Sequence, residues 1–268
     1  MNNLPIGIFD SGIGGITVLK ELIRFLPGES FIYFGDTARV PYGSKSPRTI
    51  KLYASQITQF LLSKNIKILI IACNTVSAIA IDEVKKIANV PIFEVITPPS
   101  KEAIRVTKNK RIGIIGTKRT ILSSSYQKCL LSMDPSVKLF AKPTPLLVPL
   151  IEEGLLSEKI TYEIVDFYLS DFKNKIDTLI LGCTHYPMLQ DIFKSYFENK
   201  VNIISSAKTV AMAVKNYLEK NNLFSIRKEK FLDFYVSDPI SDFSNLAPKF
   251  LGFDIPYIRS VDLAELYL

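Results

Sequence analysis

The sequence predicts an α/β protein of two similar lobes, each with a mainly parallel sheet flanked by helices. The chain of 268 residues is long for one α/β domain and comfortable for two, because a domain commonly holds about 100 to 150 residues. Short apolar runs alternate with amphipathic stretches of helical length, and the two halves contain similar segments. We expect a pseudo-two-fold axis between the lobes, with the functional site in the cleft between them.

Buried parallel strands are predicted where a short apolar run ends in small or polar residues and a helical stretch follows. The segments that fit are Ile6–Phe9, Ser30–Phe34, Lys67–Ala72, Ile92–Val95, Arg111–Ile115, Ser136–Phe140, Thr178–Leu181, Asn202–Ile204 and Phe231–Val236. Helices are expected between them, among them Ile16–Phe25, Arg48–Lys64, Ser77–Ala88, Ser123–Ser132 and Lys159–Phe172.

Two places are expected to mark crossings between the lobes. The paired prolines of residues 97–100 (TPPS) should stop any regular element. Residues 205–207 (SSA) directly follow a predicted strand. These crossings divide the chain near its middle.

The two halves echo each other at two points. Residues 6–11 (IGIFDS) resemble residues 112–117 (IGIIGT), and residues 69–75 (LIIACNT) resemble residues 179–185 (LILGCTH). Ligands of open α/β sheets bind at the carboxyl ends of the strands, where the second pair of segments presents Cys73 and Cys183. If a two-fold axis relates the lobes, these two thiols face each other across the cleft.

Composition excludes several classes of partner. The formal net charge is +7, but the basic residues are scattered and do not combine with stacking aromatics, so nucleic acid is not an expected partner. No stretch approaches the ~18 apolar residues of a membrane span. Residues 1–16 carry Asp10 and four glycines in place of a signal pattern. We therefore expect a cytoplasmic protein without a membrane partner.

The three cysteines point to individual thiol chemistry. They are odd in number, far apart and without a C-x-x-C pair, so neither a disulfide framework nor a metal site is predicted. Cys73 and Cys183 each mark the step from a buried strand to an open loop, which favours function. Cys129 occupies a predicted helix face, where core packing is the expected role.

Paired thiols on opposite sides suit inversion of a carbon centre. A thiol has an ordinary pKa of about 8.5, which its surroundings can lower, so that one thiolate accepts a proton while another thiol donates one. Inversion requires removal of hydrogen from one face and delivery to the other. Two equivalent groups in symmetric lobes serve both directions of such a reaction.

The α-hydrogen of an amino acid is a very weak acid, so its carbanion needs preorganised hydrogen-bond donors. The side chains placed to donate are Ser11, Asn74, Thr75, Thr117 and Thr184. Backbone amides of residues 12–15 (GIGG) could add an anion site at a helix start. That loop lacks the spacing of a dinucleotide fingerprint, and no P-loop motif occurs, so nucleotide binding is not predicted.

Each cysteine has a candidate assistant. His185, the only histidine, follows Cys183 by two residues and could tune that thiol or relay its proton. Asp10, in the first strand-end turn, could serve Cys73 in the same way. Asp10 could also be a helix N-cap before Ile16–Phe25, and the two roles are compatible. On pattern alone Asp36 and Glu152 are expected to be solvated charges.

Several motifs together resemble those of the glutamate racemase family. They are residues 7–15 (GIFDSGIGG), 33–43 (YFGDTARVPYG), 72–75 (ACNT), 148–154 (VPLIEEG), 182–187 (GCTHYP) and 234–239 (FYVSDP). The resemblance covers nearly the whole chain in order. It implies a two-domain α/β fold with the active site between the domains, no pyridoxal phosphate, no other cofactor and no metal. It also implies conversion of L- to D-glutamate for peptidoglycan, and hence a role in cell-wall biogenesis and cell shape.

The resemblance also implies roles for individual residues. Cys73 and Cys183 would form the acid/base pair, assisted by Asp10 and His185, with Asp36 and Glu152 as further acidic groups near the site. Substrate contacts would fall on Asp10, Ser11, Tyr42, Gly43, Asn74, Thr75, Thr117, Thr184 and His185. Thr144 is a departure, since many members of the family have a cysteine there, before the Pro-Leu run.

The family's domain pattern implies that the chain after about residue 207 returns to the first lobe. We therefore expect one domain of residues 1–97 with 207–268 and a second of residues 98–206. The family also admits a homodimer.

Other functions remain open at this stage. An aspartate or other amino-acid racemase of the same superfamily would use a similar cysteine pair, but those relatives tend to carry an acidic residue where His185 stands. A cysteine hydrolase, with Cys183 as nucleophile and His185 as base, leaves Cys73 unexplained. A cysteine phosphatase would need an arginine shortly after its thiol to bind the phosphate, and neither Cys73 nor Cys183 is followed by one. A two-lobed amino-acid binding protein would need no thiols and would usually carry an export signal.

Overall fold

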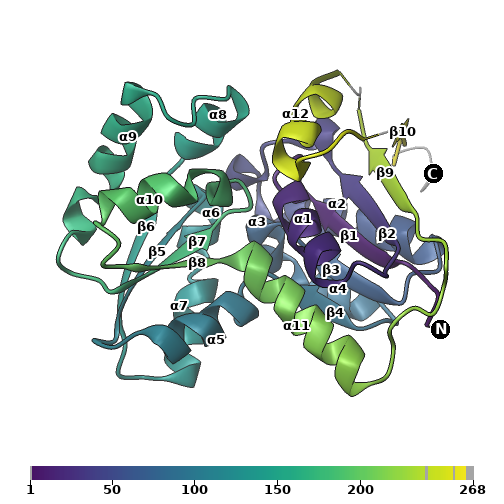
Figure 1. Ribbon diagram of the computed structural model, residues 1–268, viewed down its shortest axis with the longest axis horizontal. Helices are drawn as coiled ribbons and strands as arrows, with labels where there is room; N and C mark the ends of the chain where they lie inside the picture. Colours follow the sequence, from purple (N-terminus) through teal and green to yellow (C-terminus); the bar gives the residue numbers. More distant parts are fainter. Residues whose placement is uncertain (1, 239–240, 256, 264–268) are drawn as a thin grey trace.

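The computed structural model describes residues 2–238, 241–255 and 257–263, and it contains two parallel sheets side by side (Figure 1). The strand order is β10-β9-β2-β1-β3-β4 in the first sheet and β6-β5-β7-β8 in the second. The strands are β1 (Ile6–Asp10), β2 (Phe31–Gly35), β3 (Ile68–Ile71), β4 (Ile92–Glu94), β5 (Arg111–Gly116), β6 (Lys138–Pro143), β7 (Thr178–Gly182), β8 (Asn202–Ser205), β9 (Leu232–Val236) and β10 (Ile258–Ser260). This confirms the predicted α/β class with two lobes.

The two sheets repeat one strand order. Four neighbouring strands of the first sheet run β2-β1-β3-β4, and the second sheet runs β6-β5-β7-β8. β1 therefore corresponds to β5, and β3 to β7, as the similar sequence segments predict. The two-fold axis itself stays a prediction.

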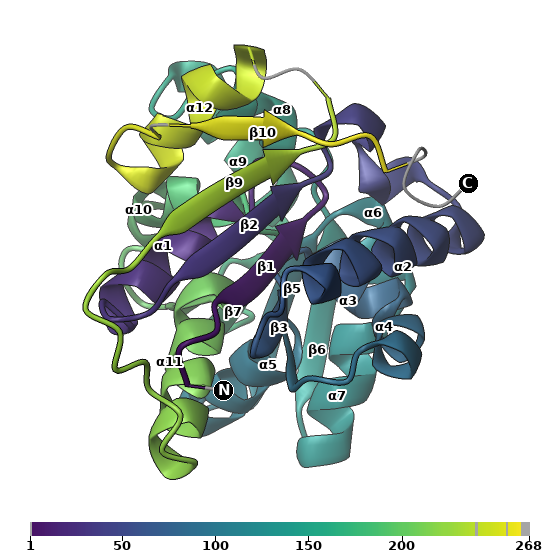
Figure 2. The same ribbon diagram turned by 90° about the vertical axis from the view of Figure 1, so that its right-hand side faces the viewer.

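Helices cover both faces of each sheet. They are α1 (Ile16–Phe25), α2 (Pro47–Ser63), α3 (Asn74–Ile79), α4 (Ile81–Ile87), α5 (Thr97–Val106), α6 (Lys118–Leu122), α7 (Ser125–Met133), α8 (Leu147–Glu152), α9 (Lys159–Leu169), α10 (Gln190–Tyr196), α11 (Ser206–Lys220) and α12 (Ser241–Leu251). Figures 1 and 2 show α1, α11 and α12 on one face of the first sheet and α2 and α4 on the other. Helices α9 and α10 lie on one face of the second sheet, opposite α5 and α7.

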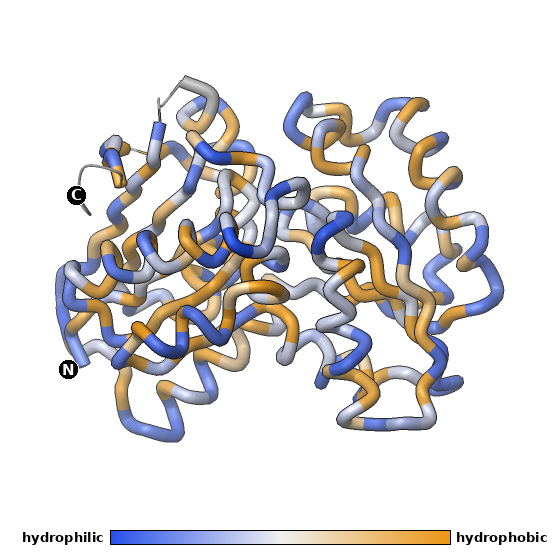
Figure 3. The backbone as a smooth tube through the Cα atoms, turned by 180° about the vertical axis from the view of Figure 1, so that it is seen from behind, coloured by the Kyte–Doolittle hydropathy of each residue, from blue (hydrophilic) through white to orange (hydrophobic). Residues whose placement is uncertain are grey.

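The strands are buried because each face of a sheet meets a helix layer. Along β1, Ile6 and Ile8 pack with the α1 side, while Phe9 packs with the α2 side. Alternate side chains of a strand point to opposite faces, so consecutive residues must be apolar, and in Figure 3 the central strands are coloured mainly as hydrophobic. No helix of the described residues is long and apolar enough to cross a membrane.

The chain crosses between the sheets through α5 and α11, which pack against each other. The expectation that residues 97–100 stop regular structure was wrong, because α5 begins at Thr97 with Pro98 and Pro99 in its first turn. Proline is tolerated there since the first N–H groups of a helix have no intrahelical acceptor. The domain limits at residues 97 and 207 stay a prediction, although β9 and β10 pair within the first sheet.

Two further details differ from the prediction. The single helix expected over Ser77–Ala88 is two helices, α3 and α4, because the backbone leaves the helical region at Ala80. Strand β10 was not predicted, since its three residues are half-buried or exposed and form no apolar run. Pro239, the last residue of the FYVSDP motif, lies outside the described residues.

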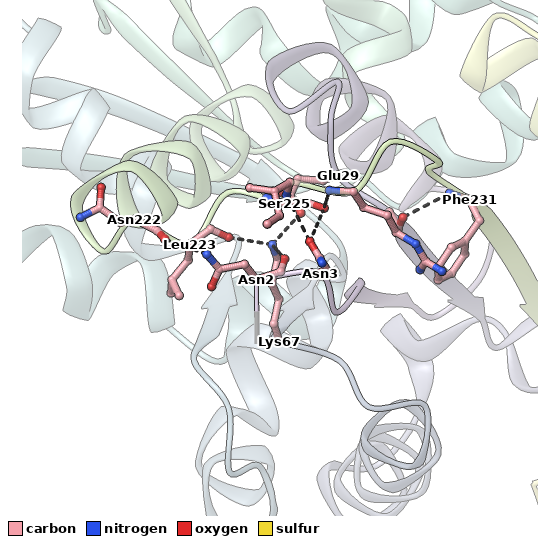
Figure 4. A network of polar contacts seen from close by, with 11 residues as sticks. Asn2, Asn3, Glu29, Lys67, Asn222, Leu223, Ser225 and Phe231 are labelled. Atoms are coloured by element: carbon pink, nitrogen blue, oxygen red, sulfur yellow. Dashed lines mark hydrogen bonds and ion pairs between the residues drawn. The ribbon is translucent and has the colours of Figure 1, made fainter.

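A buried ion pair fastens the segment between α11 and β9 to the first lobe (Figure 4). Lys67 Nζ lies 2.7 Å from Glu29 Oε2, and the two side chains are 5% and 1% exposed. The Lys67 ammonium also donates to the carbonyl oxygens of Asn2 and Leu223. Glu29 in turn accepts the backbone N–H of Ser225 at 2.8 Å.

Candidate active site between the two sheets

The first half of the site lies at the carboxyl ends of β1 and β3. These strands are parallel neighbours, with Phe9 opposite Ile71, so the loops that follow them meet. The Cys73 thiol donates a hydrogen bond to Ser11 Oγ at 3.4 Å. Asp10, the last residue of β1, is 1% exposed and accepts the backbone N–H of Gly12 at 3.1 Å.

Burial controls the protonation of this half. It raises the pKa of the Cys73 thiol to about 12, and the negative charge of Asp10 adds to the increase. Burial also raises the pKa of Asp10, although the positive charge of His185 lowers it in part. At neutral pH the Cys73 side chain is therefore a protonated thiol, ready to donate.

The N-cap alternative for Asp10 was wrong. Helix α1 has Gly15 as its N-cap, with no side-chain cap bond. A Cβ at Gly15 would lie 2.4 Å from Asp10 Cβ, so the loop passes directly over the Asp10 side chain. Asp10 is therefore not the N-cap residue of α1, and its role in the site stays a prediction.

The second half of the site lies at the carboxyl end of β7. Cys183 Sγ is 3.8 Å from His185 Nδ1, and His185 Nε2 is 2.9 Å from Glu152 Oε1 at the end of α8. Phe250 of α12 packs edge-on against the imidazole, with ring centroids 5.9 Å apart. The sequence thus placed Cys183 and His185 together, and the structure adds Glu152 as a direct partner of His185.

The pKa of His185 is set by opposing effects. Burial would lower it, but the hydrogen bonds to Cys183 and Glu152 raise it to about 10. The imidazole is therefore positively charged at neutral pH. It holds a positive charge beside the Cys183 sulfur.

This raised pKa predicts that stability depends on pH. The folded protein keeps the His185 proton up to about pH 10, whereas an unfolded histidine loses it near pH 6.5. The stabilisation is complete below pH 6.5 and is lost as the pH rises through about 10. We expect the free energy of unfolding, measured with urea, to fall more steeply over this range in the wild type than in His185→Asn. Parallel pH curves would contradict the raised pKa.

The two halves touch through the glycine loop after β1. A Cβ built at Gly14 would lie 2.3 Å from Thr184 Oγ1 and 2.5 Å from His185 Nδ1. Thr17 Oγ1 lies 2.7 Å from the carbonyl oxygen of Thr184. The loop that carries Asp10 and Ser11 is therefore packed directly against the loop that carries Cys183.

The contact at Gly14 predicts the effect of one added methyl group. In Gly14→Ala the methyl must displace the Thr184–His185 loop. We therefore expect kcat/KM for glutamate racemisation, the reaction that the resemblance implies, to fall about tenfold, because small misplacements of catalytic groups slow a reaction strongly. Gly28→Ala is the matched control, since no atom lies within 4 Å of a Cβ at Gly28. Equal activities of the two variants would show that this contact does not matter.

Three threonine hydroxyls also join the lobes. Thr75 Oγ1 of α3 lies 3.0 Å from Thr117 Oγ1 and 3.3 Å from Thr120 Oγ1. Thr117 caps α6 by accepting the Thr120 N–H at 3.2 Å. A Cβ at Gly43 would be 3.1 Å from Thr117 Cβ. Thr120 was not predicted, although a threonine three residues after an N-cap threonine is a recognisable signal.

Asp36 is fully buried, so the expectation of a solvated charge was wrong. Its carboxylate accepts hydrogen bonds from Arg39 Nε at 2.8 Å, from Ser237 Oγ at 2.7 Å and from the Tyr42 hydroxyl. These donors compensate the buried charge. The pKa of Tyr42 is raised well above its usual range by burial, by Asp36 and, to a smaller extent, by Cys73. Tyr42 thus connects Asp36 to the Cys73 half of the site.

Two buried polar atoms beside Cys73 lack partners. Asn74 Nδ2, a donor, and Asp10 Oδ1, an acceptor, have no hydrogen-bond partner among the residues that the structure describes. Both side chains are at most 2% exposed. An unsatisfied buried polar group costs about 1 to 3 kcal/mol, so the pair points to a bound molecule with a complementary acceptor and donor.

The remaining cysteine, Cys129, is half-buried and Thr144 is buried. Cys129 on α7 is half-buried and packs against the core of the second lobe, in agreement with its predicted role. Thr144 is fully buried, and its hydroxyl lies 2.7 Å from the Tyr186 hydroxyl. The departure at Thr144 thus supplies a polar partner for a buried tyrosine.

Comparison with known proteins identifies the family. The family model described as Asp/Glu/Hydantoin racemase matches residues 10–214. Glutamate racemase 2 of Caldanaerobacter subterraneus subsp. tengcongensis is 42% identical, over 98% of this chain and 99% of that protein. The structure is also similar to that of the Francisella tularensis glutamate racemase in complex with D-glutamate, with a TM-score of 0.93 and 38% identity over 99% of this chain and 100% of that one. For a Bacillus anthracis glutamate racemase the TM-score is 0.94, at 36% identity over 98% and 99% of the two chains. The chain therefore belongs to the Asp/Glu/hydantoin racemase family.

Proposed function

We propose that the protein is a glutamate racemase, an isomerase that interconverts L- and D-glutamate with two cysteine acid/base groups and no cofactor. The observation that carries the proposal is the pair of buried thiols, each at the carboxyl end of a corresponding strand and each beside its own charged side chain. Cys73 has Asp10 within electrostatic reach, and Cys183 has His185. Similarity to glutamate racemases over nearly the whole chain supports the choice of substrate.

The unpartnered atoms fit an α-amino acid. Asn74 Nδ2 would donate to the α-carboxylate, and Asp10 Oδ1 would accept from the ammonium group. Ser11, Thr184 and the threonine hydroxyls of Thr75 and Thr117 would supply further polar contacts, together with Tyr42 and Gly43. Donors on the α-carboxylate stabilise the negative charge that develops when the α-proton leaves.

The reaction then needs one proton transfer at each thiol. One thiolate removes the α-proton from one face of the carbon, and the other thiol delivers its own proton to the opposite face. The first cysteine ends protonated and the second ends as a thiolate, so the reverse reaction starts from that state. The substrate ammonium favours the thiolate form of Cys73 by its positive charge.

Solvent deuterium provides the direct test of this mechanism. In heavy water, glutamate racemised by the protein is expected to carry deuterium at the α-carbon in the product, while unreacted substrate stays protiated at early times. The reason is that the proton removed by one thiol is not the proton delivered by the other. Mass spectrometry of the separated enantiomers measures both pools. Early deuterium in the recovered substrate would point to a single exchanging base.

Substrate and cofactor independence need a separate assay. Purified protein, dialysed exhaustively, is expected to racemise glutamate much faster than aspartate. A preference for aspartate would replace the proposed substrate by the alternative within the superfamily. Loss of activity on dialysis that returns with added pyridoxal phosphate or metal would overturn cofactor independence.

We further propose that the D-glutamate supplies peptidoglycan synthesis in the cytoplasm, and thereby cell-wall biogenesis and cell shape. Expression of the chain is expected to allow growth of a bacterial strain that otherwise requires added D-glutamate. A variant without Cys73 should fail in the same assay. Growth with that variant would separate the cellular role from the proposed chemistry.

A further inference from the structure

Each cysteine loop receives a hydroxyl group from the opposite lobe. Thr17, on α1 of the first lobe, reaches the carbonyl oxygen of Thr184, which directly follows Cys183. Tyr126, on α7 of the second lobe, donates to Asn74 Oδ1 at 2.6 Å, and Asn74 directly follows Cys73. In each contact a hydroxyl of one lobe reaches the residue that directly follows the cysteine of the other lobe.

We propose that Thr17 and Tyr126 are positioning residues that fix the two thiols relative to each other by these crossed hydroxyl contacts. The catalytic part of this inference rests on the proposed function, because inversion requires both thiols at defined distances from one carbon. The lobes are joined through α5 and α11, so noncovalent contacts near the site must set the distance between the loops. Thr17 and Tyr126 contact the residues next to the two thiols.

The contact of Thr17 is more than a local helix bond. Its hydroxyl lies 2.9 Å from the Gly14 carbonyl oxygen, a usual partner for a threonine in the first turn. That oxygen already accepts the Thr17 backbone N–H at 3.0 Å. The shorter hydroxyl contact, at 2.7 Å, is with Thr184, which lies 167 residues away in the sequence. The single hydroxyl proton therefore favours the bond between the lobes.

Tyr126 touches both cysteine loops. Its hydroxyl lies within hydrogen-bond distance of two acceptors in the first lobe, Asn74 Oδ1 and the Val95 carbonyl oxygen at 2.9 Å. A Cβ at Gly182 would be 3.2 Å from Tyr126 Cε2, so the ring also packs on the backbone just before Cys183. Burial raises the pKa of the Tyr126 phenol well above its usual range, which keeps the hydroxyl a donor. The bond to Oδ1 leaves Asn74 Nδ2 free for the substrate.

Three variants separate positioning from simple stability. Thr17→Val keeps the branched shape but removes the hydroxyl, and Tyr126→Phe does the same for the ring. Thr17→Ser retains the hydroxyl and is the matched rescue variant. Loss of one such hydrogen bond is expected to lower kcat/KM about five- to tenfold in the first two variants and hardly in the third. Low activity of Thr17→Ser comparable to that of Thr17→Val would refute a role for the hydroxyl.

Thiol accessibility tests the same idea without any assay of racemisation. Iodoacetamide labelling is followed cysteine by cysteine with mass spectrometry, and half-buried Cys129 serves as the internal reference. Both Cys73 and Cys183 are 5% exposed and should react slowly in the wild type. We expect Thr17→Val to accelerate labelling of Cys183 at least fivefold, and Tyr126→Phe to accelerate labelling of Cys73. Unchanged rates, or equal acceleration of both thiols in both variants, would overturn the proposal.

Isotope effects decide whether the contacts act on the reaction. Since the two enantiomers are equally stable, kcat/KM must fall equally in both directions and cannot show which thiol has moved. The effect of α-deuterium substitution on kcat/KM does show which thiol has moved, because this isotope effect grows when the slowed step is the one that breaks the Cα–H bond. Thr17→Val should raise the effect for the enantiomer that Cys183 deprotonates and lower it for the other.

Tyr126→Phe should give the reverse pattern with the two enantiomers. Equal isotope effects for both enantiomers in these variants would remove the positioning role in catalysis. If the wild type does not racemise glutamate but the labelling pattern is found, the proposed function fails while the contacts still hold the two loops. If the protein racemises glutamate but the labelling pattern is not found, only the positioning role of Thr17 and Tyr126 is refuted.

Discussion

Replacement of Cys73 by alanine is expected to lower kcat/KM for glutamate racemisation by about 10² to 10⁴, the usual loss when one acid/base group is removed. Cys183→Ala should be affected to a similar degree. Both directions require both thiols, one to remove the proton and one to deliver it. A loss confined to one direction is thermodynamically excluded at equal stability of the enantiomers. The measurement is circular dichroism of glutamate solutions starting from each pure enantiomer.

Cys129→Ala is the matched control for these variants. Its thiol is half-buried on α7, packed against the core of the second lobe, so activity should stay close to the wild type. Near-normal activity of either Cys73→Ala or Cys183→Ala would reject the two-thiol assignment. Loss of activity in Cys129→Ala alone would require a different site altogether.

The two halves of the site are alike in topology but differ in electrostatics. Cys73 lies beside a carboxylate, and its thiol has a pKa raised to about 12. Cys183 lies beside an imidazole whose pKa is raised to about 10 by its hydrogen bonds to Cys183 and Glu152. Before substrate binds, the Cys73 half therefore holds a protonated thiol beside a carboxylate, whereas the Cys183 half holds a positive charge beside its sulfur. The two halves are thus chemically distinct although their strands correspond.

The sequence was sufficient for the features that depend on local patterns. Apolar runs located nine of the ten strands of the described residues to within three residues, all except β10, because parallel strands that are buried on both faces read as continuous apolar runs. Cys73 and Cys183 were identified because each follows such a run. The pairing of Cys183 with His185 followed from their separation of two residues, which is short enough to decide contact without the fold.

The sequence was not sufficient where the partner comes from a distant segment. Asp36 is a single acidic residue after a strand, and its burial depends in part on Ser237, 201 residues away. Thr17 and Tyr126 follow the ordinary periodicity of their helices, so nothing in either helix distinguishes them. Their significance arises only when the second lobe is placed against the first.

Replacement of Lys67 by methionine is expected to destabilise the protein by about 3 to 5 kcal/mol, because it leaves the Glu29 carboxylate buried without a counterion. This is a large fraction of the total stability of a typical domain, about 5 to 15 kcal/mol. The carbonyl oxygens of Asn2 and Leu223 would also lose their donor. Urea unfolding followed by circular dichroism measures the change.

The double variant Glu29→Gln/Lys67→Met tests whether the unpaired charge is the cause. Glutamine keeps an oxygen for the Ser225 N–H but carries no charge, so the double variant should be more stable than Lys67→Met alone. Lys86→Met is the exposed control, since Lys86 pairs with Glu83 at 3.2 Å while its side chain is 69% exposed, and such surface pairs contribute little. If the double variant were as unstable as Lys67→Met, the lost packing and carbonyl contacts of the lysine, and not the buried charge of Glu29, would account for the effect.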